Sequence, residues 1–240
     1  MAYGTGGLTL REKTEKKKIE FSKKDITVLI LMVCTAVLIT VFGIHFKQSF
    51  LRILPLCVSL IIGMLQSRVN RFASLMGSVN SLLYAAVYVH FNLYASAFSA
   101  LLFSCPIQLL NFIRWNKNKW EHSTVLRKLS GKQRILIAVG YVAALAAMWV
   151  VLPLIGSQYV FLDSVTNLLG ILIYFLTMFA YVEYTFLMII NGVIGIILYL
   201  TMLEATPETV TYLIFSVYSF ICVTFSFFEA RKLYGNQQHK

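Results

Sequence analysis

Charged residues are scarce in this sequence, and acidic ones are the scarcer kind. Only 13% of the 240 residues are charged, with 10 acidic against 21 basic side chains, whereas about a quarter of a soluble domain is charged. So few charges cannot cover a water-soluble surface, which excludes an ordinary soluble fold. In a chain this apolar, the formal net charge of +11 indicates basic loops on one side of a membrane, and no nucleic-acid partner is expected.

Clusters of reactive or metal-binding residues are also missing. The four cysteines fall in apolar runs without CxxC spacing, which disfavours disulfides and metal sites. The four histidines are scattered, and the sequence shows neither a nucleophile–base pair nor a glycine-rich phosphate loop. No series of Asp, Glu and His crosses the apolar runs, which argues against proton pumping. We therefore expect no enzyme activity, no metal and no cofactor.

Long apolar runs are what the sequence has in abundance. Hydrophobic residues make up 58% of the chain, and its mean hydropathy is +0.74. The runs are about 18–22 residues long, enough to cross a hydrocarbon core of roughly 30 Å as helices. No small-residue cleavage site follows the first run, so no cleaved signal peptide is expected. The sequence predicts an all-α polytopic membrane protein in a lipid bilayer, with eight spans at residues 26–46, 51–67, 72–91, 93–115, 134–153, 160–181, 184–203 and 208–229.

Lysine and arginine are distributed unevenly over the segments between these spans. With the N-terminus inside, the cytoplasmic segments hold 19 of the 21 basic residues, and only Lys47 and Arg52 fall on the other side. The positive-inside rule therefore predicts that both termini are cytoplasmic, which requires an even number of spans.

Two segments of the chain resemble each other. Asn80-Ser-Leu-Leu-Tyr84-Ala-Ala-Val-Tyr88 and Asn191-Gly-Val-Ile-Gly195-Ile-Ile-Leu-Tyr199 both start with Asn and place Tyr eight residues later. The same offset superposes spans 2, 3 and 4 on spans 6, 7 and 8, which predicts two parallel three-helix repeats joined by a linker helix, a 3+1+3 plan. The chain then divides into a cytoplasmic basic tail (1–25), a leading transmembrane helix (26–50), a first repeat (51–115), a cytoplasmic loop with the linker helix (116–159), a second repeat (160–230) and a cytoplasmic tail (231–240).

Polar side chains inside the apolar runs are the candidates for a solute site, because they are costly unless they pair or face water. Gln108, Asn111 and Trp115 lie on one face of the fourth span, where Pro106 predicts a kink or hinge. An uncharged, aromatic cavity suits a flat ring joined to a hydroxylated group. Packing of helices through the same residues is the alternative. The substrate-binding candidates are Gln108, Asn111, Trp115, Asn80, Tyr84, Tyr88, Tyr174, Tyr184, Asn191 and Tyr199.

These residues resemble motifs of the PnuC-like nicotinamide riboside and vitamin transporters. The first motif runs from Gly77-Ser-Val-Asn80 through Pro106-Ile-Gln108 to Trp115, and the second from Asp163 through Tyr181-Val-Glu183-Tyr184 to Asn191. The resemblance implies a fold similar to the SWEET sugar transporters and a bacterial cytoplasmic membrane. It also implies facilitated diffusion of the vitamin, trapped inside the cell by phosphorylation. Gln108, Asn111, Trp115, Tyr184 and Asn191 are the ligand contacts that it implies.

One departure from the family pattern leaves the substrate open. After the glutamate the family usually has two tryptophans three residues apart, and here those positions are Tyr184 and Leu187. Thiamine, riboflavin or a deoxynucleoside is therefore an alternative to nicotinamide riboside. A SWEET-type sugar transporter and a membrane scaffold whose polar residues only pack helices are further alternatives. The sequence also leaves open a homo-oligomer.

Overall fold

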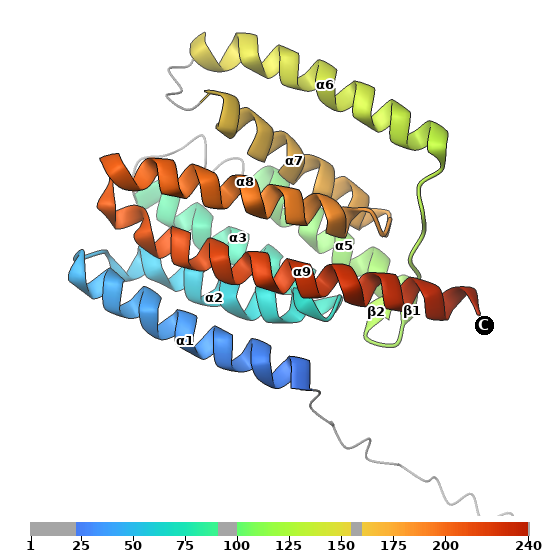
Figure 1. Cartoon of the computed structure of the whole chain (residues 1–240), viewed down its shortest axis with the longest axis horizontal. Helices are drawn as coiled ribbons and strands as arrows, with labels where there is room; N and C mark the ends of the chain where they lie inside the picture. The colour runs from blue at the N-terminus through green and yellow to red at the C-terminus, as the bar shows by residue number, and fades with distance from the viewer. Residues whose placement is uncertain (1–22, 91–99, 155–159, 240) are drawn as a thin grey trace, which may run out of the picture.

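A computed structural model describes residues 23–90, 100–154 and 160–239 (Figure 1). Residues 1–22 of the expected basic tail and the start of the expected fourth span lie outside the described residues. The α-helices are α1 (Lys23–His45), α2 (Phe50–Ser67), α3 (Phe72–His90), α5 (Cys105–Lys117), α6 (Gly131–Leu154), α7 (Val160–Met178), α8 (Tyr184–Ala205) and α9 (Val210–Gln238). The shorter elements are a π-helical turn (Ala100–Ser104), a 3₁₀ turn (Pro207–Thr209) and a hairpin of β1 (Lys119–Trp120) and β2 (Ser123–Thr124).

The expected all-helical membrane fold is confirmed, because a described helix falls in each of the eight spans. Within the described residues, four helical segments have the length and composition to cross a membrane, namely Lys24–His45, Phe50–Ser67, Tyr184–Ala205 and Pro207–Gln238. Phe72–Ala86 and Leu168–Met178 are shorter apolar stretches. The long α9 continues to Gln238, well past the end expected at residue 229.

Six helices form a ring, and two more lie outside it. Neighbours in the ring are α2 and α3, α3 and α5, α5 and α7, α7 and α8, α8 and α9, and finally α9 and α2. Helix α1 packs on α2 and α9 from outside, and α6 packs on α7 at the opposite edge (Figure 1). We call α2, α3 and α5 the first half and α7, α8 and α9 the second half. The repeat relationship between the halves stays a prediction.

The two outer helices expose apolar side chains over their free faces. Ile30 of α1 is 59% exposed and Leu136 of α6 is 72% exposed. In water such surfaces would be costly, whereas lipid chains solvate them without penalty. The outer helices therefore present a lipid-facing surface, and the polar groups of the chain are left to the inside of the ring and to its two ends.

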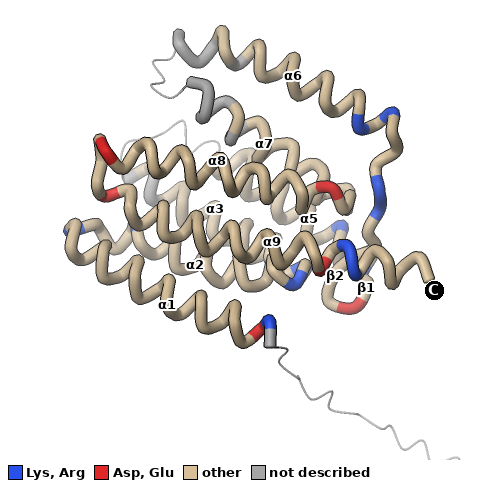
Figure 2. Tube along the Cα trace, viewed as in Figure 1, with Lys and Arg blue, Asp and Glu red and all other residues tan. Residues whose placement is uncertain are grey.

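Charges lie at the two ends of the bundle, and one end is strongly basic (Figure 2). Lys47 and Arg52 lie at one end, together with Glu204 and Glu208. At the other end, which we call the basic end, both α1 begins and α9 finishes (Figure 1). The remaining described Lys and Arg lie there, from Lys24 and Arg68 to the loop after α5 and the end of α9.

The loop between α5 and α6 folds over the basic end of the ring. Its residue Arg127 pairs with Tyr181 in a parallel bridge, through Arg127 N to Ala180 O and Val182 N to Arg127 O, both 2.8 Å. The Gln237 side chain of α9 accepts from Leu126 N (2.8 Å) and donates to Thr124 O (3.0 Å). These contacts explain why α9 stays helical beyond the expected span: its last turns pack on the loop.

Candidate functional site

Two polar cavities lie within the six-helix ring. Cavity 1 has a volume of about 220 Å³ and is lined by residues near the basic end of α3, such as Ala73 and Ser74. Cavity 2 has a volume of about 490 Å³ and is lined by residues further along α3, from Gly77 to Tyr84. Four side chains line both cavities: Gln66, Gln108, Tyr174 and Ser219. The cavities therefore follow one another along the bundle and meet at these four side chains, which we call the junction.

Gln108 is placed at the junction by a glycine on the neighbouring helix. Its Nε2 donates to the Ser81 hydroxyl (3.0 Å), and its Oε1 lies against Gly77, so close that a Cβ on that residue would overlap it. Glycine at position 77 thus makes room for the amide. Ser81 in turn donates to Gly77 O (3.0 Å), which fixes the orientation of the hydroxyl that Gln108 contacts.

Three asparagines line the cavities with an unsatisfied oxygen. Asn111 is 2% exposed and lines cavity 1 together with Asn191, while Asn80 is 5% exposed and lines cavity 2. The Asn80 Nδ2 donates to the Ser59 hydroxyl (2.8 Å). All three Oδ1 atoms are buried, and no described residue donates a hydrogen bond to any of them. A buried acceptor without a donor costs about 1–3 kcal/mol, so a bound solute with donors would recover that cost.

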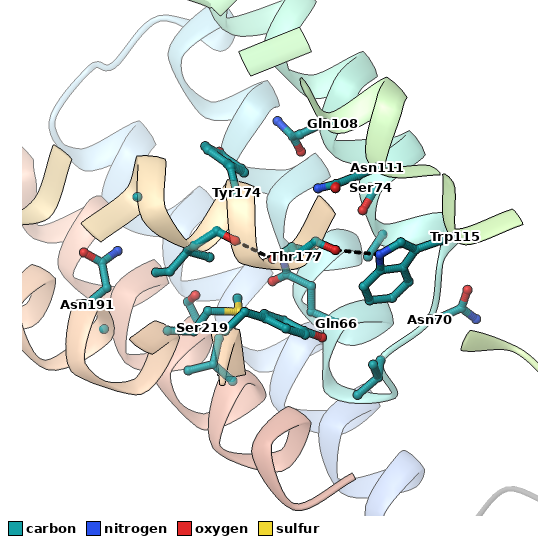
Figure 3. A pocket seen from close by; sticks show the side chains of 18 residues that line it. Gln66, Asn70, Ser74, Gln108, Asn111, Trp115, Tyr174, Thr177, Asn191 and Ser219 are labelled. Carbon is teal, nitrogen blue, oxygen red and sulfur yellow. Dashed lines mark hydrogen bonds between the residues drawn. The ribbon is translucent and has the colours of Figure 1, made fainter. Parts of the chain in front are cut away.

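An aromatic wall stands at the basic end of cavity 1. Trp115 and Tyr184 are both buried, with ring centroids 6.2 Å apart and planes at 65°. The Trp115 Nε1 donates to Thr177 O (2.7 Å), as Figure 3 shows. Since its only donor is used in this way, Trp115 offers a solute the surface of its ring.

A hydrophobic cluster lies directly behind this wall. Leu126 and Leu129 of the loop pack with Leu233 of α9 against Trp115 and Tyr184. All of these side chains are at most 7% exposed. The loop therefore covers the aromatic wall of cavity 1 at the basic end.

The structure brings most of the predicted site residues together. In Figure 3, Gln108, Asn111 and Trp115 of the first half line the pocket with Tyr174 and Asn191 of the second half. Tyr184 also lines cavity 1, and Asn80 and Tyr84 line cavity 2. Their role in substrate binding stays a prediction.

Two predicted positions do not line the cavities, and the side chain of a third is not described. Tyr199 lines neither cavity, and its ring stacks on Tyr212 at 5.7 Å. The side chain of Tyr88 lies outside the described residues. Pro106 is the second residue of α5, directly after the π-helical turn that ends at Ser104. Its missing backbone N–H therefore falls at the change from π-helix to α-helix, and α5 continues from there to Lys117.

Sequence reasoning missed Gln66 and Asn70 among the residues that line the cavities. Gln66 lies in the last turn of an apolar span, where a polar residue is easily taken for an interfacial one. Asn70 lies in the short connection between α2 and α3. The signal for Gln66 was a glutamine still inside the hydrophobic run. No sequence pattern identified Asn70.

A ring of helices, three of them long and apolar enough to cross a membrane, around two adjoining cavities with polar side chains is typical of a membrane transporter. The family model described as "Nicotinamide mononucleotide transporter" matches residues 49–229, and the chain belongs to this family. A solved structure titled "Crystal structure of the Vitamin B3 transporter PnuC" has the same fold, with a TM-score of 0.73 at 20% identity over 90% of this chain and 94% of that one. No curated protein matches the sequence. The predicted resemblance to PnuC-like transporters is confirmed.

Proposed function

We propose that this transporter carries an unphosphorylated vitamin nucleoside, nicotinamide riboside, by facilitated diffusion. The observation that supports it most is the pair of buried Oδ1 atoms of Asn111 and Asn191 on cavity 1, to which no described residue donates. The hydroxyls of a ribose and the amide of a nicotinamide are donors that match such acceptors. The flat ring would then lie beside Trp115 and Tyr184.

The absence of charge on the cavity walls favours a nucleoside over a nucleotide. Among the described residues, no Lys, Arg, His, Asp or Glu lines cavity 1 or cavity 2. A phosphate would bring a charge of about −1.5 to −2 into an environment without a cation to pair with it, which is costly. The cavity suits the riboside although the family description names the mononucleotide.

The same walls suit a cationic ring. The nicotinamide ring of the riboside is a pyridinium, and a cation is attracted to the faces of Trp and Tyr rings. Trp115, Tyr174 and Tyr184 supply these rings around cavity 1. No described base lines the cavity to repel the ring.

Uptake would be driven by the electrochemical gradient of the solute itself, without a coupled ion. A proton-coupled transporter needs a titratable group in the pathway, and the described cavity walls have no carboxylate or imidazole. Phosphorylation of the riboside inside the cell would maintain the gradient. In this proposal the basic end is cytoplasmic, both termini lie inside, and the membrane is the bacterial cytoplasmic membrane.

The transport cycle would move the two halves against each other around the junction. Gln66 and Gln108 come from the first half, and Tyr174 and Ser219 from the second. A relative movement of the halves would therefore open or close the passage between the cavities. The π-helical turn before Pro106 is the hinge in this proposal, and the halves are the two repeats of the 3+1+3 plan.

Related solutes are the alternative to nicotinamide riboside, because Tyr184 and Leu187 stand where the family usually has two tryptophans. Leu187 packs against the hydrophobic cluster and lines neither cavity, and Tyr184 is smaller than the tryptophan usual in the family. Thiamine, riboflavin or a deoxynucleoside would exploit the extra room. A membrane scaffold, by contrast, would bind none of these solutes.

Calorimetric titration of the purified protein in detergent tests the proposal. Nicotinamide riboside, its mononucleotide, thiamine, riboflavin and a deoxynucleoside are compared in parallel. We expect saturable binding of the riboside and none of the mononucleotide. Equal binding of both would contradict the argument from charge, and binding of another solute alone would identify that solute as the substrate.

Paired variants locate the site. Asn111→Leu and Asn191→Leu remove the acceptors and should each weaken binding about 5- to 150-fold, since a solute donor left buried without an acceptor costs about 1–3 kcal/mol. Thr201→Val is the control on α8, because its hydroxyl bonds to Ile197 O on an exposed face. Unchanged binding in both asparagine variants would show that the amides only pack helices.

A further inference from the structure

A second polar pocket lies at the basic end, outside the ring interior. It has a volume of about 380 Å³ and lies where α1, the end of α2, the hairpin turn and α9 converge (Figure 2). Every side chain that lines it is polar, and six of the seven are titratable: Lys24, Asp25, Arg68, Asn70, His122, Glu229 and Lys232. A lining without an apolar residue and with six titratable side chains favours a charged ligand over lipid chains or a hydrophobic solute.

The bases of the pocket outnumber its carboxylates. Lys24, Arg68 and Lys232 face two acids, and both acids are already paired. Lys24 Nζ lies 3.2 Å from Glu229 Oε2, and Arg68 Nε lies 2.8 Å from Asp25 Oδ1. Lys232 makes no ion pair within the described part of the chain. The pocket thus keeps one cation that no carboxylate of the described residues neutralises.

Several donors remain in the pocket, beside the second oxygens of its two carboxylates. Lys24 uses two of its three N–H groups, on Ser67 O (3.0 Å) and Glu229. Asn70 Oδ1 accepts from Phe72 N (2.9 Å), so its amide has only N–H groups left to offer a ligand. Lys232 adds three more donors. Donors around a net positive charge match an anion with several acceptor oxygens.

The depth of the pocket in the bilayer points to a phospholipid headgroup as the anion. Lys24 and Asp25 are in the first turn of α1, and the next residues on its lipid-facing side, Ile26, Leu29 and Ile30, are 47%, 40% and 59% exposed. The pocket is therefore at the height where hydrocarbon gives way to headgroups. A phospholipid with its chains along α1 would place its phosphate beside Lys24 and Lys232.

We propose that this pocket binds a phosphate-type anion and that its source is the headgroup of an anionic phospholipid. The bound phosphate would join α1 and α9 to the hairpin, which already contacts the end of α2. There, His122 Nε2 donates to Arg68 O (2.9 Å), and Arg71 N donates to His122 O (3.1 Å). Asn70 lines both this pocket and cavity 1. The lipid would therefore stabilise the sealed arrangement of the basic end.

Native mass spectrometry of the full chain in neutral detergent tests this site without any transported solute. Phosphatidylglycerol is titrated against phosphatidylcholine with identical chains, and the affinity for the first bound lipid is measured. We expect tighter binding of phosphatidylglycerol, weakened roughly fivefold in Lys232→Gln. Arg231→Gln is the matched control, since Arg231 lies over the Phe227 ring (4.1 Å) and does not line the pocket.

Inorganic phosphate distinguishes the two sources of the anion. Retention of phosphatidylglycerol in millimolar phosphate supports the lipid, whereas displacement that depends on Lys232 supports the anion site with a soluble ligand and overturns the lipid source. Equal binding of the two lipids with no effect of phosphate would overturn the site. So would equal losses in the Lys232 and Arg231 variants, because general surface charge would then explain the binding.

Discussion

The indole nitrogen of Trp115 and the backbone carbonyl of Thr177, 62 residues apart in sequence, form a 2.7 Å hydrogen bond beside cavity 1. The bond links α5 of the first half to α7 of the second. The Thr177 hydroxyl donates within its own helix, to Ile173 O (2.7 Å). The Thr177 carbonyl is the group that accepts the indole N–H. The contact holds the two halves together at the sealed end and orients the Trp115 ring along the cavity wall.

Trp115→Phe keeps an aromatic ring but removes the donor. We expect a loss of about 1 kcal/mol in stability, the net value of one hydrogen bond, and a smaller loss of substrate affinity than in Trp115→Leu, which also removes the ring face. Thermal unfolding in detergent and solute titration measure the two effects. Trp149→Phe is the control, because Trp149 is 60% exposed. Equal affinity in Trp115→Phe and Trp115→Leu would show that the ring does not contact the solute.

Gly77→Ala should displace Gln108, because the added Cβ overlaps its Oε1. We expect substrate binding to weaken about tenfold, the effect of losing one well-placed hydrogen bond. In the background of Gln108→Ala the same substitution should have little further effect, since the displaced group is gone. Gly140→Ala on α6, where nothing lies within 4 Å of the added atom, should leave binding unchanged. Additive effects of Gly77→Ala and Gln108→Ala would contradict the proposed contact.

Pro106→Ala tests the hinge next to the π-helical turn. An alanine restores a backbone donor and allows regular α-helix to replace the π-helical turn before α5. We expect the rate of uptake into proteoliposomes to fall several-fold, with the dissociation constant of the solute unchanged within about twofold. Pro207→Ala, in the 3₁₀ turn before α9, is the comparison outside the cavity region. An unchanged uptake rate would exclude Pro106 as a hinge.

Glu183 holds the loop that seals the basic end. Its carboxylate accepts from Leu129 N (3.1 and 3.2 Å) and from Arg134 Nη2 (2.8 Å). Glu183→Ala leaves the Leu129 N–H without an acceptor and should cost about 1–3 kcal/mol. Glu183→Gln keeps an acceptor and should cost less. Thermal unfolding and the rate of proteolysis in the loop measure the difference; similar values for the two variants would mean that the carboxylate does not hold the loop.

The helices and much of the cavity lining followed from local patterns. Apolar run lengths located most of the spans, although not the end of α9 at Gln238. The spacing of Gln108, Asn111 and Trp115 placed them on one face that the structure turns towards cavity 1. The pattern failed for Tyr199, which shares the Asn-to-Tyr spacing of the first half but stacks on Tyr212. Periodicity fixes which residues share a face and not which neighbour that face meets.

Composition and periodicity alone determined that this chain is a helical membrane protein, because the bilayer requires long apolar helices and tolerates buried polar groups only where they are satisfied or functional. The tertiary structure decided which polar residues meet. It placed Gln66 of α2 and Tyr174 of α7 on the walls of the same cavities, packed the loop against Trp115, and gathered Lys24, His122 and Lys232 around one pocket. These residues are far apart in sequence, and only the packing of helices around a closed ring sets the distances between them.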